Sequence, residues 1–307
     1  MNTDFELKAN GKLLISGEYL VLNGAKSLAF PIRFGQKINV CPVQEPVLHW
    51  KSMQNSQTWF TATFNLPDLM ILTASDTVVA SELIRILKAV LTLNPEFIPD
   101  NSGFSVEINA DFPLEWGLGS SSTLIYLIAR WANVNEFSVF RLVADGSGYD
   151  LACAGKQTPV FYQLVDNFPI IANAEFGYAI KNHCLFAYLG NKQNTNEELK
   201  SYKNTAIASQ LQIDRISELS EEFCNVSDPK ELIDVIKEHE QIISTVLKRP
   251  ALSQQRFPDF KGGVKSLGAW GGDFAMFAAD ISQDELRKDI NRLGLTTLFS
   301  YDELLIK

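Results

Sequence analysis

The residues with the clearest chemical potential form a glycine- and serine-rich segment, Pro113-Leu-Glu-Trp-Gly117-Leu118-Gly119-Ser120-Ser121-Ser122, which runs directly into an apolar stretch. The glycines allow a tight turn that exposes successive backbone N–H groups, and the serines add hydroxyl donors. The positive end of the following helix points to the same place. This combination predicts a cradle for an anion such as a polyphosphate. A glycine-serine turn with a serine at the helix N-cap is the structural alternative, and the local sequence leaves it open.

This segment differs from the two most familiar nucleotide-binding motifs. The pattern GxxxxGK[ST] is absent, because the nearest candidate, Gly11-Lys12, is followed by Leu13. A dinucleotide-binding GxGxxG would need glycine at the position of Ser122. That motif also follows a strand buried on both faces, whereas apolar and polar residues alternate over 104–109 and predict a half-exposed strand. A dinucleotide oxidoreductase is therefore disfavoured.

Further segments carry residues suited to a catalytic site. Asn10-Gly-Lys12-Leu-Leu-Ile-Ser-Gly17-Glu18-Tyr19 puts a lysine at the start of an apolar strand and a carboxylate on the following turn. Gly146-Ser-Gly148-Tyr-Asp150 holds an acid on a short loop, although a helix-capping aspartate has the same appearance. Gly268-Ala-Trp-Gly271-Gly272-Asp273 permits close backbone approach, a pattern that taken alone is more typical of a tight turn than of a binding loop.

The remaining reactive residue types do not cluster. The 3 histidines (His49, His183 and His239) lie far apart, which argues against a histidine metal site or a Ser-His-Asp triad. His239 shares a helical face with apolar residues, so we expect it to be packed inside the protein. The 4 cysteines contain no CxxC pair and indicate free thiols in a reducing cytosol.

Composition excludes several classes of protein. The chain has 307 residues, of which 46% are hydrophobic, enough for one large or two medium domains. Its 36 acidic against 27 basic residues give a net charge of -9, which argues against non-specific binding to nucleic acid. The N-terminus has no apolar signal region, and no stretch of about 20 apolar residues could span a membrane. We expect a cytoplasmic protein that is not membrane-bound.

The elements that must position these residues mix strands with helices. Apolar, β-branched or aromatic runs predict strands at 13–15, 19–22, 37–43, 57–64 and 104–109. Apolar residues at helical spacing predict helices over 77–93 and about 121–131. Capping residues predict the starts of two more helices, at Asp228-Pro229 and at Ser282, and Gly294 is expected to end the second of them.

The order of these elements favours an α+β fold. It lacks the strict βαβ rhythm of a doubly wound sheet. A boundary is expected near 160–175, around Pro159 and Phe168-Pro169, which divides the chain into domains 1–165 and 166–307.

Taken together and in order, the four segments resemble the motifs of the GHMP kinases, the family of galactokinase, homoserine kinase, mevalonate kinase and phosphomevalonate kinase. GKLLISGEYLVLNG is similar to the N-terminal motif, and its GEY form looks closest to phosphomevalonate kinases. PLEWGLGSSST resembles the PxxxGLGSSAA phosphate loop, and GSGYDLA the segment of the catalytic acid. LGAWGGDF stands in the place of the last glycine-rich loop. The resemblance spans about residues 8–280, and the joint order is more specific than any single motif.

The resemblance implies a role for each matching residue. Asp150 would orient or deprotonate the acceptor oxygen, Lys12 would neutralise charge there, and Glu18 and Tyr19 would lie near the acceptor. Ser121 would also contact Mg²⁺. The residues implied to hold ATP are Gly117, Leu118, Gly119, Ser120, Ser121, Ser122, Gly268, Gly271 and Gly272. The family fold implies an N-terminal domain like domain 2 of ribosomal protein S5 and a ferredoxin-like C-terminal domain, with the active site in the cleft.

Three departures from the family pattern stand out. Asn10 replaces the usual proline before Gly-Lys, and Trp270 and Asp273 replace glycines of the last loop. Val139 stands where the family's Mg²⁺ carboxylate is expected. The resemblance thus implies a kinase that transfers the γ-phosphoryl of MgATP to a hydroxyl or phosphate of a small metabolite, possibly of the mevalonate pathway. A non-catalytic metabolite-binding or sensing protein of the same fold is the alternative. The sequence determines neither the acceptor nor the oligomeric state.

Overall fold

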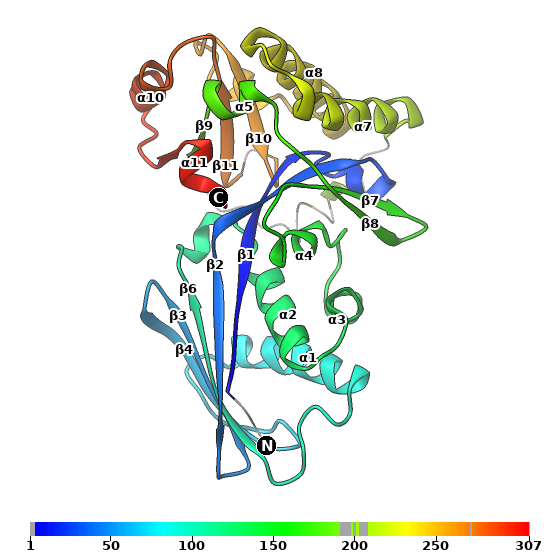
Figure 1. The fold of residues 1–307 in the computed structure, drawn as a ribbon, viewed down its shortest axis with the longest axis vertical. Helices are drawn as coiled ribbons and strands as arrows, with labels where there is room; N and C mark the ends of the chain where they lie inside the picture. Colours follow the sequence, from blue (N-terminus) through cyan, green and yellow to red (C-terminus); the bar gives the residue numbers. More distant parts are fainter. Residues whose placement is uncertain (1–3, 191–197, 199–200, 203–207, 271, 307) are drawn as a thin grey trace. The chain divides into compact units, whose positions relative to one another are not determined.

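The computed structural model describes residues 4–306 apart from 191–197, 199–200, 203–207 and 271 (Figure 1). Its contacts divide the described chain into two compact units. The first unit comprises the chain up to Gly11 with Phe34–Leu114 and Leu118–Gly155, and the second comprises Lys12–Arg33, Glu115–Gly117 and the chain from Lys156 onward. The division therefore cuts strand β1 (Phe5–Ser16) and strand β2 (Ser27–Val43). A single boundary at residue 165 stays a prediction.

The first unit is built on a sheet whose strands lie in the order β5-β4-β3-β6-β2, with β1 paired to β2. The further strands are β3 (Val47–Gln54), β4 (Gln57–Asn65), β5 (Ile71–Ala74) and β6 (Gly103–Ala110). β3 and β6 run parallel, whereas β2 pairs antiparallel with β6. The alternation predicted over 104–109 is confirmed, because Phe104, Val106 and Ile108 are buried and the residues between them are only half-buried.

Helices of the first unit lie together on one side of this sheet (Figure 1). They are α1 (Thr77–Leu93), α2 (Ser120–Trp131), α3 (Glu136–Val143) and α4 (Tyr149–Ala154). The helix predicted over 77–93 is confirmed, and it begins where it does because the Asp76 carboxylate accepts hydrogen bonds from the N–H groups of Val78 and Val79. Buried side chains of these helices and strands form one hydrophobic core.

The second unit contains an antiparallel sheet in the order β10-β11-β9-β12. Its elements follow the chain as β9 (Cys184–Tyr188), α7 (Gln210–Asn225), α8 (Pro229–Leu247), α9 (Leu252–Gln255), β10 (Gly263–Leu267), β11 (Phe274–Ala278), α10 (Gln283–Arg292) and β12 (Leu298–Phe299). Strands and helices in this order, with β9 and β11 central, make the ferredoxin-like arrangement that the resemblance implied. α8 packs on β10 and α10 packs on β9.

A hairpin of β7 (Val160–Val165) and β8 (Phe168–Asn173) also belongs to the second unit, where β7 pairs with Ser27–Ala29 of β2. Its two-residue turn, Asp166-Asn167, has positive φ at both positions, as the tightest hairpins require. The region 160–175, where a boundary was expected, is therefore a paired structure. Short helices α5 (Tyr178–His183) and α11 (Tyr301–Leu304) complete the unit.

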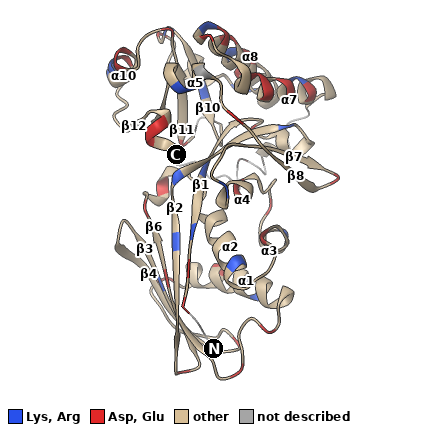
Figure 2. Ribbon diagram, in the orientation of Figure 1, with Lys and Arg blue, Asp and Glu red and all other residues tan. Residues whose placement is uncertain are grey.

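Capping chemistry defines the long helices of the second unit. Asp228 caps α8 with Pro229 in its first turn, and Ser282 and Glu285 form a capping box on α10, so both predicted helix starts are confirmed. Acidic and basic residues lie along α7 and α8 (Figure 2). Arg215 of α7 joins the two helices, since its Nε lies 2.6 Å from Oε1 of Glu238 on α8.

One predicted strand is wrong. Residues 19–22 do not extend β1, and Leu20–Asn23 form a 3₁₀ helix, η1. The chain reverses before it because Gly17 (φ 89°) and Tyr19 (φ 60°) both adopt left-handed backbone conformations, and Gly24 (φ 87°) ends the helix in the same way. Positive φ is strained for a bulky residue such as Tyr19, so its surroundings must hold the turn in place.

Candidate active-site residues

The predicted anion cradle folds as a turn between a short 3₁₀ helix and the start of helix α2. Leu114–Trp116 form a 3₁₀ helix, η2, and Gly117 (φ 67°) and Gly119 (φ 90°) then place the backbone in left-handed conformations. Gly119 is the N-cap of α2, and no side chain caps this helix. The alternative of a serine N-cap is therefore wrong. Ser120, Ser121 and Ser122 occupy the first helical turn instead, where backbone N–H groups lack partners within the helix.

Buried contacts hold the start of α2 within the first unit. The Leu118 side chain is fully buried, and the Thr123 hydroxyl donates to Oε1 of Gln36 on β2 at 2.9 Å. Ser121 is exposed, whereas Ser120 and Ser122 are half-buried. Buried contacts thus hold the first turn of α2 in place, while Ser121 is exposed to solvent. A rigid support with an exposed polar residue suits a binding loop.

Residues just before the loop pack within the second unit. The Trp116 ring contacts the rings of Tyr188, Phe274 and Phe299, at centroid distances of 5.8, 6.0 and 5.6 Å. Asp273 is 8% exposed, and its carboxylate lies directly over Gly117, since a Cβ added to that glycine would stand 1.8 Å from Asp273 Oδ2. The side chain of Asp273 therefore leaves room only for glycine at position 117.

This contact predicts a coupled effect on stability. Gly117→Ala is expected to lower the free energy of unfolding by about 1–3 kcal/mol, because the Asp273 side chain must move and alanine is strained at positive φ. In an Asp273→Gly background the same substitution should cost only about 1 kcal/mol, the strain alone. Denaturant unfolding of the two single variants and the double variant measures the coupling. An equal cost in both backgrounds would show that the aspartate does not restrict this position.

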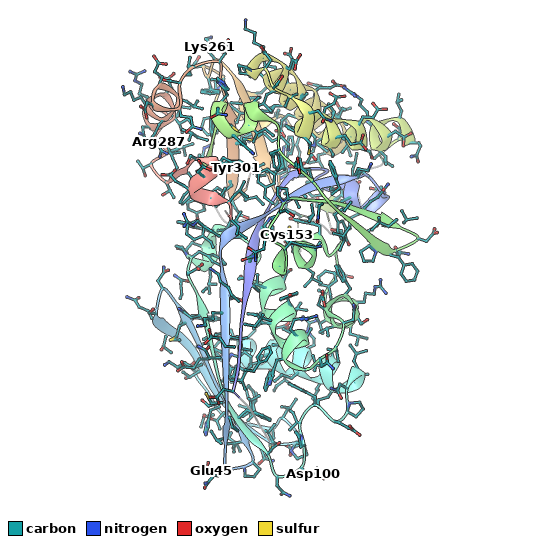
Figure 3. All side chains as sticks on the ribbon, viewed as in Figure 1. Glu45, Asp100, Cys153, Lys261, Arg287 and Tyr301 are labelled. Atoms are coloured by element: carbon teal, nitrogen blue, oxygen red, sulfur yellow. The ribbon has the colours of Figure 1, made fainter. Side chains whose placement is uncertain are left out.

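Asp150 lies in the first turn of α4, directly after Gly148 (φ 82°), which is the N-cap. Its side chain is half-buried, and it does not cap the helix, so the reading as an N-cap aspartate is wrong. Leu151 and Cys153 anchor α4 in the first unit, and Figure 3 labels Cys153 on this helix.

The N-terminal motif folds with the second unit from Lys12 onward. Lys12 is half-buried on β1. Glu18 is 1% exposed and bonds to protein groups: its Oε1 lies 2.6 Å from Nζ of Lys265 on β10, and its Oε2 lies 3.3 Å from Nε2 of His239 on α8. Burial raises the pKa of Glu18 to about 7, against the opposing effect of the Lys265 ammonium. A contact of Glu18 with an acceptor stays a prediction, and its described partners belong to the protein.

Tyr19 and the last glycine-rich loop meet in the second unit. The backbone N–H of Trp270 donates to the Tyr19 hydroxyl at 2.9 Å, and that hydroxyl donates to Oε2 of Glu198 at 3.2 Å. Burial raises the pKa of Tyr19. The Trp270 indole is buried and donates to the Pro250 carbonyl at 3.1 Å.

The glycines of that loop are described in part. Gly268 has φ 80° with nothing within 4 Å of an added Cβ, the Gly272 N–H donates to the Ala269 carbonyl at 2.9 Å, and Gly271 lies outside the described residues. Two loop amides, of Trp270 and Gly272, are thus already bonded within the protein. The assignment of Gly268, Gly271 and Gly272 to ATP stays a prediction.

The glycine-serine turn lies at the start of a helix, as the sequence predicted, whereas Asp150 lies inside the first turn of α4 and not on the loop before it. Lys12, Glu18 and Tyr19, which were expected in an N-terminal domain 1–165, fold with the second unit. Sequence reasoning missed Lys265 and His239 as partners of Glu18. A lysine inside an apolar strand, between Val264 and Leu267, was the available signal, because a buried ammonium needs carboxylate partners. Val139 is fully buried, and its side chain has no oxygen or nitrogen atom that could bind Mg²⁺.

No described helix is long and apolar enough to cross a membrane. Among the same residues, no group of three or more His, Cys, Asp or Glu side chains could hold a metal ion.

The fold is shared with several solved kinases. The Methanococcus jannaschii mevalonate kinase matches with a TM-score of 0.71 and 17% identity, over 100% of this chain and 99% of that chain. A Streptococcus pneumoniae phosphomevalonate kinase, in complex with phosphomevalonate and AMPPNP, matches with a TM-score of 0.69 and 18% identity, over 96% and 99%. Lactococcus lactis galactokinase, complexed with galactose, matches with a TM-score of 0.68 and 11% identity, over 99% and 94%.

No protein-family model matches the sequence, and no curated protein does. The structural matches nevertheless cover almost the whole of each chain. The α+β fold expected from the sequence is therefore confirmed as the GHMP kinase fold.

Proposed function

We propose that this chain, with the fold of the GHMP kinases, is a small-molecule kinase that transfers the γ-phosphoryl group of MgATP to a hydroxyl or phosphate oxygen of a small metabolite. The observation that carries the proposal is the start of α2. Gly117 and Gly119 adopt left-handed conformations and three serines fill the uncapped first turn. A helix start of this kind binds phosphate through backbone N–H groups, hydroxyls and the helix dipole.

The predicted motifs would each contribute to the reaction. Gly117–Ser122 would wrap the ATP phosphates, with Ser121 as a ligand of the Mg²⁺ that accompanies them. Lys12 would offset the negative charge of the transferring group. Gly268, Gly271, Gly272 and Tyr19 would line the bound substrates. Mg²⁺ supplies charge neutralisation on the phosphates.

Asp150 would accept the proton that a hydroxyl acceptor loses during the transfer. The acceptor oxygen attacks the γ-phosphorus, the bond from that phosphorus to the bridging oxygen of ADP breaks, and a hydroxyl acceptor passes its proton to the Asp150 carboxylate. A phosphate acceptor needs only to be aligned. Phosphoryl transfer depends mostly on alignment and charge neutralisation, which these residues can provide.

A non-catalytic metabolite-binding protein of this fold is the second candidate. One observation favours it: Asp273 brings a negative charge over Gly117, where a family glycine would leave room, and a carboxylate repels phosphate. Trp270 also puts a large, buried side chain in the last glycine-rich loop, where a family glycine would leave room.

A panel assay separates the two candidates. Mevalonate, phosphomevalonate, galactose and homoserine are each incubated with MgATP, and ADP release and new phosphoester signals are followed by phosphorus NMR. Acceptor-dependent ADP release supports the kinase, and with a hydroxyl acceptor Asp150→Asn should strongly reduce it. ATP or acceptor binding in calorimetry without transfer to any acceptor would favour the binding protein.

A further inference from the structure

A buried ionic cluster lies in the second unit behind the turn that carries Tyr19. Lys265 of β10 is 0% exposed. Its ammonium donates to Oε1 of Glu18 at 2.6 Å, to Oε1 of Glu240 at 3.2 Å and to the Ser266 carbonyl at 2.9 Å. Three acceptors satisfy the three N–H bonds of the ammonium. The lysine therefore ties the turn after β1 to helix α8 through strand β10.

The cluster contains more acid than base. Two buried carboxylates, Glu18 and Glu240, face one ammonium. The His239 imidazole of α8 also faces them, 3.3 Å from Oε2 of Glu18 and 3.9 Å from Oε1 of Glu240. From α7 the described contact is the Phe223 ring, 6.1 Å from the imidazole, which brings no charge. With both carboxylates ionised and the histidine neutral, the cluster would carry a net negative charge in a dry interior, at a large cost in free energy.

The hydrogen bonds of His239 fix its proton on Nδ1. The Gly17 N–H donates to His239 Nε2 at 3.2 Å, so the lone pair of Nε2 accepts and a neutral ring must carry its hydrogen on Nδ1. Oε2 of Glu18 lies 3.3 Å from the same Nε2 and has no hydrogen-bond partner in the structure. If Glu18 were ionised, two acceptors would face each other. A hydrogen on Oε2 removes that repulsion, and the O–H then shares the single lone pair of Nε2 with the Gly17 N–H.

We propose that Glu18, His239, Glu240 and Lys265 hold one shared proton, located on Oε2 of Glu18 and directed at His239 Nε2, and that this proton positions the Gly17–Tyr19 turn. With it the cluster is neutral: a protonated Glu18, a neutral His239, an ionised Glu240 and a charged Lys265. The turn needs such support, because Gly17 and Tyr19 both have positive φ. Glu18, His239 and Lys265 are thus positioning residues for Tyr19.

The titration behaviour of the cluster agrees with this arrangement. Burial is the main cause that raises the pKa of Glu18 to about 7, and the Glu240 charge adds to it. Burial and then the Lys265 charge hold the pKa of His239 well below its usual range, and burial raises the pKa of Glu240. Because the Glu18 carboxyl binds its proton more tightly when folded, its contribution to stability is full in acid and is lost as pH rises through about 7.

Glu18→Gln tests the shared proton in the ligand-free protein. Glutamine is permanently neutral, and its amide can donate to His239 while its oxygen accepts from Lys265. Relative to wild type, the melting temperature of the variant should rise by about 5 °C or more between about pH 5 and pH 8.5, because only wild type loses the proton. The matched control is Glu238→Gln, next to His239 on α8 but exposed and paired with Arg215. Because that ion pair lowers the pKa of Glu238, the difference of this variant from wild type should stay constant between about pH 5 and pH 8.5 and shrink only in more acidic solution.

A second readout needs no variant. Nitrogen-15 NMR of labelled imidazoles should show one of the 3 histidines as the neutral Nδ1–H form at about pH 6, with a change in its Nε2 shift as pH rises through about 7 when Glu18 ionises. A charged or Nε2–H His239, or a Glu18→Gln difference curve that is flat with pH, would overturn the proposal. Both measurements are independent of ATP and of any acceptor, so the inference and the kinase proposal can fail separately.

Discussion

Asp150→Asn is expected to lower the turnover of phosphoryl transfer by about 100-fold or more and to change ATP affinity by no more than a few-fold. Asparagine preserves the size of the side chain but cannot take a proton from the acceptor. The helix itself should persist, because Leu151, Ala152, Cys153 and Ala154 are all buried on α4 and Gly148 remains its N-cap. Steady-state rates at saturating MgATP, together with calorimetric titration of ATP, measure the two quantities.

The matched control for this variant is Asp145→Asn. Asp145 is an exposed acid on the loop that leads into the same helix, so its removal changes the net charge equally without touching α4. Its turnover and melting temperature should stay close to those of wild type. If Asp150→Asn kept its turnover on an accepted hydroxyl substrate, the proton would have to leave by another group, and the role assigned to Asp150 would be wrong.

Sequence periodicity predicted those elements whose signals are local. The α1 helix over Thr77–Leu93, the alternating strand β6 and the capped starts of α8 and α10 each depend on residues within a few positions of one another. The strand predicted over 19–22, after β1, was wrong because the local signal is ambiguous there. A run such as Tyr19–Leu22 is apolar whether it extends a strand or forms a 3₁₀ helix. The choice is made by the backbone reversal at Gly17 and Tyr19.

The candidate site was predictable where a motif fixes the backbone, and not where partners come from distant parts of the chain. The positive φ of Gly119 and Gly148 could be expected from glycine at a helix start. The pairing of Glu18 with Lys265 joins residues 247 positions apart. No short-range pattern encodes such a pair, because the ferredoxin-like sheet that buries Lys265 must form first. The contact of Asp273 with Gly117 belongs to the same class.

Gly119→Val is expected to abolish nucleotide binding, with ATP affinity lower by at least about 100-fold on the scale of a lost phosphate-binding interaction. Two physical causes act together. Gly119 has φ 90°, a conformation that a β-branched residue cannot adopt without strain, so valine would displace the first turn of α2 and its amides. A branched side chain at this N-cap would also occupy the space in which we place the phosphates. Calorimetric titration of MgATP measures the loss.

Backbone strain alone has its own control, Gly294→Val. Gly294 has nearly the same backbone angle, φ 85°, and nothing lies within 4 Å of an added Cβ, so valine there meets the strain without a steric conflict. It follows α10 in the second unit and has no assigned role. Both variants should melt at lower temperature than wild type, but only Gly119→Val should lose ATP. Unchanged ATP affinity in a folded Gly119→Val protein would remove this turn from the nucleotide site, and with it the observation on which the kinase proposal depends.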